Sequence, residues 1–244
     1  MKKYKLILIL LMSFSISVNA LAQKQYDIVV YGGTSAGISA AIQASRMGKS
    51  VALIEPTDCL GGLTTGGLGQ TDIGNKQAIG GISREFYQNI RKYYDNPKNW
   101  KWQSKEEYAD DGQTRTSKEE DTMWTFEPSA AKYVFAEMIA PEKIDIFYNL
   151  RLNRETGVKM KDKQISVIKM ETGESFKGKM FIDATYEGDL MAAAGVSYTI
   201  GRESNAVYGE TLNGVQANRL SYTLKRWTST NGYNHNFVEG VDPY

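Results

Sequence analysis

Three glycines follow a short apolar run near the start of the chain. The run covers residues 26–31, and the glycines are Gly32, Gly33 and Gly37. A glycine turn between a buried strand and a helix points backbone N–H groups and the positive end of the helix dipole at a phosphate. The spacing therefore predicts that this turn binds the pyrophosphate of a dinucleotide.

An acidic residue stands where such a nucleotide needs one. Residues 38–48 are predicted to form a helix rich in small residues, and residues 51–54 a second buried strand that ends at Glu55. A carboxylate at this point of a βαβ unit accepts hydrogen bonds from a ribose hydroxyl. The glycine turn and the acid together predict a dinucleotide-binding unit, and they suit FAD and NAD alike.

A second glycine-rich passage, residues 60–72, follows the second strand. It has too few large side chains to form a core, so its backbone is expected to approach a ligand closely. Residues 82–94 and 130–140 have the periodicity of amphipathic helices, the latter beginning at Pro128. Between them, residues 95–125 predict a solvated surface excursion rather than a lid, with three tryptophans at Trp100, Trp102 and Trp124.

The second half of the chain predicts β-structure. Residues 144–178 are expected to form a small antiparallel meander, and residues 180–185 a parallel core strand that ends in small and polar side chains. This ending is typical of a sheet edge that faces a ligand. Glu187 or Asp189, just beyond it, is expected either to bond a cofactor hydroxyl or to cap the next helix.

This order of elements resembles the FAD domain of flavoprotein disulfide reductases. More narrowly, it resembles the bacterial FAD-dependent oxidoreductases grouped with the heterodisulfide reductase A-like flavoproteins. The resemblance is carried by residues 31–37, 55–62, 65–69, 126–128 and 181–190 and extends from Tyr26 to about Gly214. It implies an α/β fold: a Rossmann-like FAD-binding domain with a parallel sheet and an antiparallel β-meander insertion, followed by the start of an incomplete substrate domain.

The same resemblance implies which residues bind FAD. The glycine turn would hold the pyrophosphate, Glu55 the adenosine ribose, and the second glycine passage would run toward the flavin. The implied residues are Gly32, Gly33, Thr34, Ser35, Ala36, Gly37, Glu55, Gly61, Gly62, Thr64, Asp183, Ala184, Thr185 and Asp189. Thr34 stands at the middle glycine of the G-x-G-x-x-G pattern, so its side chain is expected to crowd the turn. No catalytic residue is implied.

Composition excludes several classes of protein. The chain of 244 residues has a formal net charge of +1, so it lacks the basic surface expected of a nucleic-acid-binding protein. Its only cysteine and only histidine, Cys59 and His235, exclude an internal disulfide, a Cys/His zinc site and a four-cysteine iron–sulfur cluster from this chain alone. No metal is predicted, and Cys59 is interpreted as an inert thiol and His235 as a surface residue.

Three regions follow from these patterns. Residues 1–22 resemble a secretory signal that ends at Ala20-Leu21-Ala22, which predicts export to the periplasm or the medium without a stable membrane anchor. Residues 23–200 are predicted to form the FAD-binding domain. Residues 201–244 are predicted to begin a substrate region that stops early, so that a missing C-terminal half or a partner chain would complete the flavin site.

The sequence thus favours an exported FAD-dependent oxidoreductase that moves hydride or electrons between the flavin and a small molecule. The substrate and the electron acceptor are not identified, although the tryptophans of residues 95–125 suit a carbohydrate-derived substrate. One alternative is an NAD-binding dehydrogenase of the same fold. Another is a truncated fragment that binds a nucleotide without catalysis. A carbohydrate-binding module has only the aromatic excursion in its favour.

Overall fold

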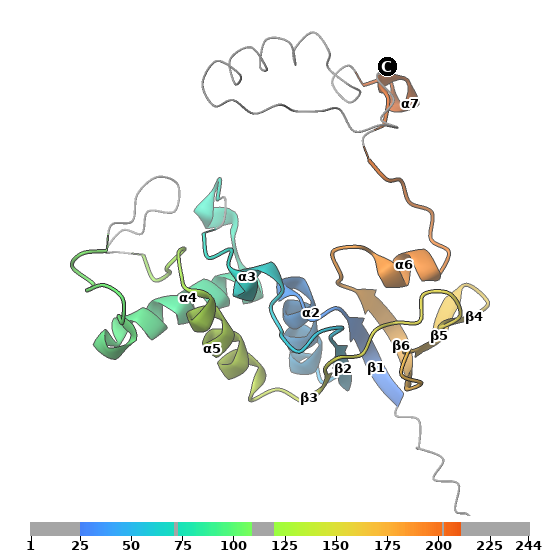
Figure 1. The fold of residues 1–244 in the computed structure, drawn as a ribbon, viewed down its shortest axis with the longest axis horizontal. Helices are drawn as coiled ribbons and strands as arrows, with labels where there is room; N and C mark the ends of the chain where they lie inside the picture. Colours follow the sequence, from blue (N-terminus) through green and yellow to red (C-terminus); the bar gives the residue numbers. More distant parts are fainter. Residues whose placement is uncertain (1–24, 71–72, 109–119, 202, 211–244) are drawn as a thin grey trace, which may run out of the picture. The chain divides into compact units, whose positions relative to one another are not determined.

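The computed structural model describes residues 25–70, 73–108, 120–201 and 203–210. These residues divide into two units, one ending at Val196 and the other beginning at Ser197. The first unit holds the sheet and most helices, and the second holds the short helix α7 (Asn205–Tyr208) (Figure 1). The predicted signal sequence and His235 lie outside the described residues.

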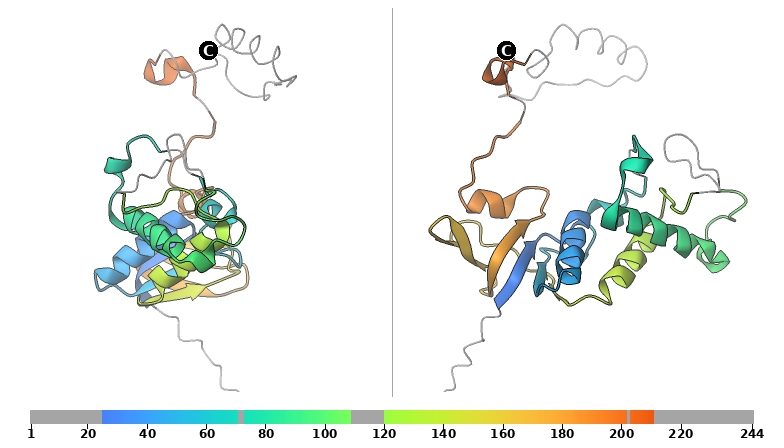
Figure 2. Two further views of the ribbon diagram at one scale, coloured as in Figure 1. Left: turned by 90° about the vertical axis from the view of Figure 1, so that its left-hand side faces the viewer. Right: turned by 180° about the vertical axis from the view of Figure 1, so that it is seen from behind.

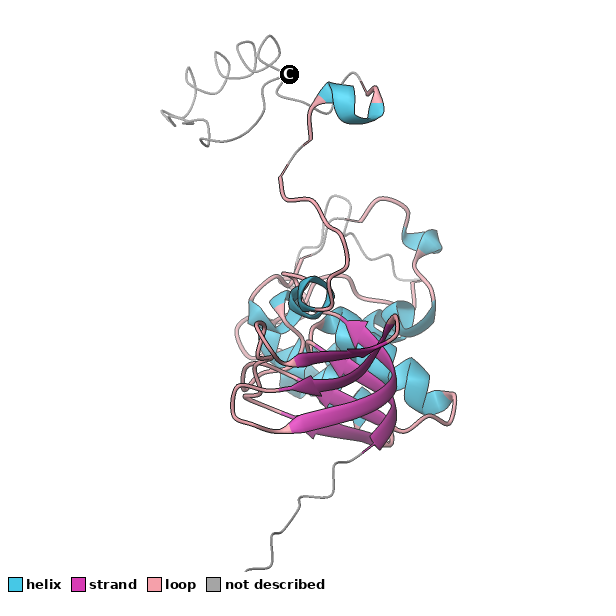
Figure 3. Cartoon of the chain, turned by 90° about the vertical axis from the view of Figure 1, so that its right-hand side faces the viewer, coloured by secondary structure: helices cyan, strands magenta, loops and turns pink. Residues whose placement is uncertain are grey.

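Six strands form one sheet in the order β3-β2-β1-β6-β5-β4. The strands are labelled in Figure 1 and drawn in magenta in Figure 3. Their bounds are β1 (Gln25–Tyr31), β2 (Val51–Ile54), β3 (Ile144–Phe147), β4 (Val158–Lys161), β5 (Gln164–Lys169) and β6 (Ser175–Asp183). The strands β3, β2, β1 and β6 are parallel, and β5 and β4 extend the sheet in antiparallel fashion. The prediction of a Rossmann-like parallel sheet with an antiparallel insertion is therefore confirmed.

The boundary between the parallel sheet and the insertion differs from the sequence prediction. β3, expected as the first strand of the meander, pairs in parallel with β2. β6 is one strand of nine residues, where the sequence suggested a short strand and a separate core strand. In the sequence, Gly178 suggests a break between these two strands. In the structure it pairs with Tyr26 of β1, and a Cβ on it would lie 2.8 Å from Val29 Cγ2. Pairing across the sheet overrides the local preference of glycine here.

The helices of the first unit gather mainly on one side of the sheet (Figure 2). α2 packs against β1 and β2, and α4 and α5 pack against α2 and against each other. The predicted amphipathic helices are confirmed as α4 and α5. The bounds are α2 (Ser35–Arg46), α3 (Leu63–Gly66), α4 (Gly81–Asp95), α5 (Pro128–Ile139) and α6 (Asp189–Ala193), with 3₁₀ turns η1 (Lys76–Ala78) and η2 (Pro97–Asn99).

Two apolar clusters cover the two faces of the central strands. Val30 and Leu53 are buried against α2, α4 and α5. Val29 and Ile54 point the other way and pack with side chains of β5, β6 and α6, including Ile168, Phe176 and Leu190. Because β2 is buried on both faces, its sequence is an uninterrupted apolar run. In the parallel register Tyr31 pairs with Ile54, so β1 and β2 end at one level.

The described part of the excursion is anchored to α4 by aromatic side chains. Trp124 is 1% exposed, and its ring centroid lies 4.5 Å from that of Tyr87. The Trp100 indole N–H donates a hydrogen bond to the carbonyl oxygen of Tyr94, 2.7 Å away. The excursion is therefore packed rather than solvated at these points, and only Trp102 among its tryptophans stays open to solvent.

Candidate functional site

The strands β1, β2 and β6 end at the same level of the sheet. Tyr31, the last residue of β1, pairs with Ile54 of β2 and with Asp183 of β6. The chain leaves β1 toward β2 on one side, while β6 occupies the other side. In open α/β sheets, ligands bind at the carboxyl edge where the strand order reverses in this way.

A cleft of about 570 Å³ opens at this edge, and we call it the dinucleotide cleft. The predicted residues that line it are Gly32, Thr34, Glu55, Gly62, Thr185 and Asp189. The others surround it. Ser35 and Ala36 begin α2, and Gly33, Gly37, Gly61, Thr64, Asp183 and Ala184 support its loops without lining it.

The glycine turn after β1 is required by its geometry. Gly32 has a φ of +99°, and a Cβ there would lie 2.7 Å from the backbone nitrogen of Thr185. A Cβ on Gly37 would lie 1.9 Å from the carbonyl oxygen of Gly32. The first glycine therefore permits the tight turn, and the last lets α2 begin directly against it.

Thr34 at the middle position is accommodated without crowding the turn. It is the N-cap of α2, and its hydroxyl accepts a hydrogen bond from the N–H of Gly37 at 3.3 Å. The same hydroxyl donates to the carbonyl oxygen of Ala184 at 2.8 Å. The expected crowding is relieved because the side chain folds back onto the helix end and the end of β6, where it is buried.

Glu55 is held beside the glycine turn. Its side chain is buried, and Oε2 accepts a hydrogen bond from the N–H of Gly33 at 2.7 Å. Oε1 accepts from the N–H and the hydroxyl of Thr57, at 2.8 and 2.7 Å. A carboxylate offers roughly four acceptor positions, so these three donors fix its orientation and leave capacity for a ligand hydroxyl.

The second glycine passage is joined to the first. The N–H of Gly61 donates to the carbonyl oxygen of Gly33 at 2.7 Å. Gly62 has a φ of +55°, and a Cβ there would lie 2.3 Å from the hydroxyl of Tyr186. That hydroxyl accepts a hydrogen bond from the N–H of Leu63 at 2.7 Å, so Tyr186 holds the start of α3 next to the end of β6. Sequence reasoning missed Tyr186, whose signal is an aromatic residue directly after a strand that ends in small side chains.

Asp183 and Thr185 shape the start of α6. Asp183 Oδ1 accepts from the N–H and the hydroxyl of Thr185, and its Oδ2 accepts from the N–H of Met191 at 2.8 Å. The Thr185 hydroxyl in turn accepts from the N–H of Gly188 at 2.9 Å. These two side chains therefore satisfy the helix end, and the expectation that Glu187 or Asp189 caps it is wrong: Gly188 is the N-cap, in the left-handed conformation.

Three cationic side chains that the sequence analysis did not single out also line the dinucleotide cleft. They are Lys132 of α5, and Arg151 and Arg154 of the loop between β3 and β4. Tyr31 holds this loop, because its hydroxyl accepts a hydrogen bond from the N–H of Leu152 at 2.9 Å. Burial raises the pKa of Tyr31, so the hydroxyl stays protonated at neutral pH. No motif marks these residues, since they approach the cleft only through pairing of distant segments.

The arrangement fits a dinucleotide. It combines a helix N-terminus at a glycine turn, a fixed buried carboxylate and several cations around one cleft. Among residues 25–70, 73–108, 120–201 and 203–210, no three His, Cys, Asp or Glu side chains gather as a metal site. Within the same ranges, no helix is long and apolar enough to cross a membrane.

Comparison with known proteins agrees with this chemistry. A family model described as FAD dependent oxidoreductase matches residues 27–241. No curated protein matches the chain.

Solved structures are similar at low sequence identity. Thioredoxin reductase of T. acidophilum is 18% identical over 66% of this chain and 35% of its own, with a TM-score of 0.37. L-proline dehydrogenase from P. horikoshii is 16% identical over 74% and 59%, with a TM-score of 0.44. THI4 of Thermovibrio ammonificans is 13% identical over 82% and 73%, with a TM-score of 0.48. The chain thus spans about a third of the first of these structures and three-fifths of the second.

Proposed function

Because the chain belongs to the family of FAD-dependent oxidoreductases, we propose that it binds FAD in the dinucleotide cleft and transfers hydride or electrons to or from a small molecule. FAD is the cofactor of this family. The observation that carries the proposal is the buried carboxylate of Glu55, fixed at 2.7 Å from the N–H of Gly33 in the glycine turn. A turn of this kind recognises the pyrophosphate of an adenine dinucleotide, and an acid at this distance along the chain recognises its adenosine ribose.

Different residues of the cleft would bind different parts of the cofactor. The N-terminus of α2, opened by Gly32 and Gly37, would hold the pyrophosphate, and the free acceptor capacity of Glu55 would take a ribose hydroxyl. Arg151, Arg154 and Lys132 supply positive charge at the same cleft, which the acidic residues Glu55, Glu171, Glu187 and Asp189 also line. The side chain of Arg154 is oriented by Asp189, with Nη1 3.4 Å from Oδ1. Arginine geometry suits the oxygen atoms of a diphosphate.

The second glycine passage would then follow the cofactor toward its flavin end. Gly62, Thr65 and Gly66 line the cleft beyond the pyrophosphate turn, and the Tyr186 hydroxyl accepts a hydrogen bond from the neighbouring N–H of Leu63. When bound, the isoalloxazine would supply the hydride chemistry. The chain's own part is to orient the cofactor along these loops and to exclude water from it.

Export of the protein and its narrower family are also proposals. The apolar segment within residues 1–22 and its small residues at Ala20 and Ala22 support export. The motifs at residues 60–69 and 181–190 support the narrower kinship with heterodisulfide reductase A-like flavoproteins. The electron acceptor is not identified.

Two competing functions make different predictions for a binding experiment. An NAD-binding dehydrogenase would take up NAD in preference to FAD. A nucleotide-binding fragment would take up FAD but would not pass electrons from any donor through it. The test is to mix the purified chain with FAD, remove free flavin, and record the flavin absorbance that stays with the protein. Bleaching of the bound flavin by a sugar or other small donor without air then reports electron transfer.

A further inference from the structure

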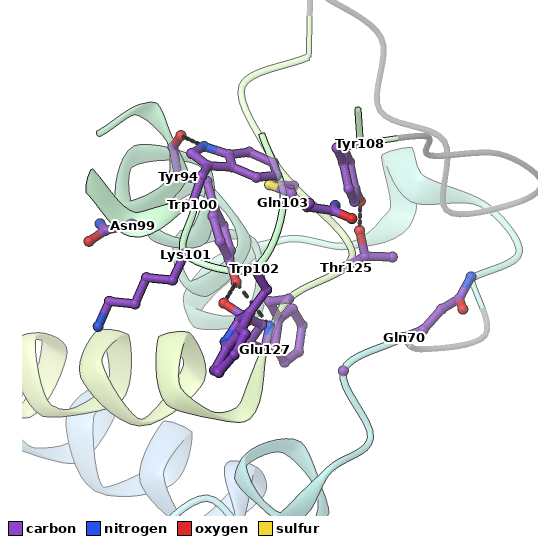
Figure 4. Close-up of a pocket in the computed structure, with 13 residues that line it drawn as sticks. Gln70, Tyr94, Asn99, Trp100, Lys101, Trp102, Gln103, Tyr108, Thr125 and Glu127 are labelled. Carbon is purple, nitrogen blue, oxygen red and sulfur yellow. Dashed lines mark hydrogen bonds between the residues drawn. The ribbon is translucent and has the colours of Figure 1, made fainter. Parts of the chain in front are cut away.

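A second cavity of about 390 Å³ lies between α4, the excursion and the segment before α5 (Figure 4). We call it the aromatic pocket, and it shares no lining residue with the dinucleotide cleft. The side chains that matter below are Tyr94, Trp100, Lys101, Trp102, Gln103 and Glu127. Its volume falls within the range of roughly 300–1,000 Å³ that small-molecule sites occupy.

The inner wall of this pocket is held in place before any ligand arrives. Trp100 is fixed by the hydrogen bond of its indole N–H to the Tyr94 carbonyl oxygen, and its ring lies 5.1 Å from that of Tyr94 and 5.4 Å from that of Tyr108. The hydroxyls of Tyr108 and Thr125 are hydrogen-bonded to each other (Figure 4). A rigid aromatic wall loses little conformational entropy when a ligand binds.

Trp102 is the opposite case, a large aromatic side chain left open at the mouth of the pocket. It is 87% exposed, and no ring contact to it is found among the described residues. Trp102 and Glu127 both line the pocket (Figure 4). A ligand that covered the indole would remove this apolar surface from water, which is the main gain available at an aromatic platform.

Hydrogen-bond donors and hydrogen-bond acceptors both line the aromatic pocket. Glu127 Oε2 accepts a hydrogen bond from the Tyr94 hydroxyl at 3.0 Å, which leaves acceptor capacity on the carboxylate. The Gln103 amide offers a donor and an acceptor and has no partner within the described ranges. Lys101 adds a cation that balances the charge of Glu127, so the lining is neutral as a whole.

We infer that the aromatic pocket binds one pyranose unit of a neutral carbohydrate. A pyranose presents C–H groups on a face, which stack on an indole, and hydroxyls around its edge, which both donate and accept hydrogen bonds. An organic cation would also suit the aromatic rings and Glu127, but Lys101 in the same lining makes the net charge zero and so weakens the attraction for a cation. The neutral lining and the paired donors and acceptors favour the sugar.

This inference deepens the proposed function, because it names the substrate class of the same oxidoreductase. The pocket and the dinucleotide cleft are joined by a short stretch of backbone. Gly66 lines the cleft, and Gly69, three residues on, lines the aromatic pocket. Gly69 is fixed there because its carbonyl oxygen accepts from the N–H of Phe126 at 3.0 Å, and a Cβ on it would lie 1.9 Å from the Phe126 oxygen. A sugar held in the pocket would thus lie next to the loop that runs along the cofactor.

The test is calorimetric titration of the full chain with neutral oligosaccharides, with and without FAD. The probes are cellotetraose, maltotetraose, mannotetraose, xylotetraose and chitotetraose, with tetramethylammonium chloride as the competing cation. At least one oligosaccharide should bind at millimolar or lower concentration. Trp102→Ala should weaken that binding by about tenfold or more through loss of the stacking surface, and Glu127→Gln by several-fold. Neither variant should change FAD uptake.

Tyr133→Ala is the matched control, since Tyr133 is a half-exposed aromatic residue of α5 that lines neither the aromatic pocket nor the dinucleotide cleft. Its affinity for the sugar should equal that of the parent chain. The inference is overturned if no oligosaccharide binds to folded protein, if Trp102→Ala binds as tightly as the parent, or if only the cation binds. Because FAD uptake is recorded separately, failure of sugar binding leaves the proposed cofactor site untouched, and failure of FAD uptake leaves the sugar site untouched.

Discussion

Single atoms decide what residues the glycine turn tolerates. A Cβ at position 37 would lie 1.9 Å from the Gly32 oxygen, which is far shorter than any nonbonded contact, and the obstacle is backbone that no rotamer change can move. The start of α2 would have to move away from the turn. We therefore expect cofactor affinity to be more sensitive to this position than to any charged side chain at the mouth of the cleft.

Gly37→Ala should lower FAD affinity by at least about a hundredfold, because displacing the helix start removes the backbone groups that face the pyrophosphate. The measurement is a titration of flavin fluorescence, with far-ultraviolet circular dichroism to show that the variant is folded. Gly74→Ala is the control, since a Cβ at Gly74 has no neighbour within 4 Å. Unchanged affinity in the Gly37 variant would show that the pyrophosphate lies elsewhere.

Glu55→Ala should weaken FAD binding by about tenfold and also destabilise the fold by about 1–3 kcal/mol, because the N–H groups of Gly33 and Thr57 lose their buried acceptor. Titration with FAD and chemical unfolding measure the two effects. Glu187→Gln alters another carboxylate of the same cleft, an exposed one, and should leave both nearly unchanged. Equal effects of the two substitutions would argue against a ribose contact at Glu55.

At the scale of elements, the sequence predicts what is local and misses what is paired at a distance. The continuous apolar run of β2 and the spacing of Phe86 and Ile90 in α4 identify those elements because burial imposes the pattern directly. The place of β3 in the parallel sheet and the continuity of β6 through Gly178 depend on neighbouring strands. For the same reason, the local motifs of the glycine turn and Glu55 pointed to the site, whereas no motif marks Arg154, which reaches the cleft only through pairing of distant segments.

The junction of α4 and α5 predicts a pH effect on stability. Burial raises the pKa of Tyr94, whose hydroxyl donates to Glu127 Oε2 and accepts from the Glu127 N–H. A group whose pKa is raised by folding contributes stability that is fully present below its unfolded value of about 10 and is lost as pH rises beyond it. The free energy of unfolding should therefore decline above about pH 10.

Tyr94→Phe should lower stability at neutral pH by about 1 kcal/mol and make the alkaline decline shallower than in the parent chain. Urea unfolding at a series of pH values measures both. Tyr148→Phe is the control, because the pKa of Tyr148 is also raised by burial but its hydroxyl has no hydrogen bond to Glu127. Comparing the two variants separates the effect of burial from the effect of the hydrogen bond to Glu127. Identical pH profiles for the parent and the Tyr94 variant would refute the assignment.

For the whole molecule, the topology explains why the site lies where it does. The sheet reverses its order between β1 and β6, and the ends of β1, β2 and β6 meet at one edge. That edge brings together the glycine turn, the acid and the second glycine passage, and it places them beside the end of β6, 150 residues further along the chain, as the bond from Thr34 to Ala184 illustrates. Membership of the FAD-dependent oxidoreductase family then assigns FAD rather than NAD to a cleft whose geometry alone would suit either.

The most direct test is FAD binding by the purified full chain, with NAD as competitor. We expect that FAD stays with the protein after free flavin is removed, that NAD in large excess does not displace it, and that Gly37→Ala abolishes the uptake. Folded parent protein that takes up NAD instead, or takes up neither nucleotide, would contradict the assignment of this cleft to FAD.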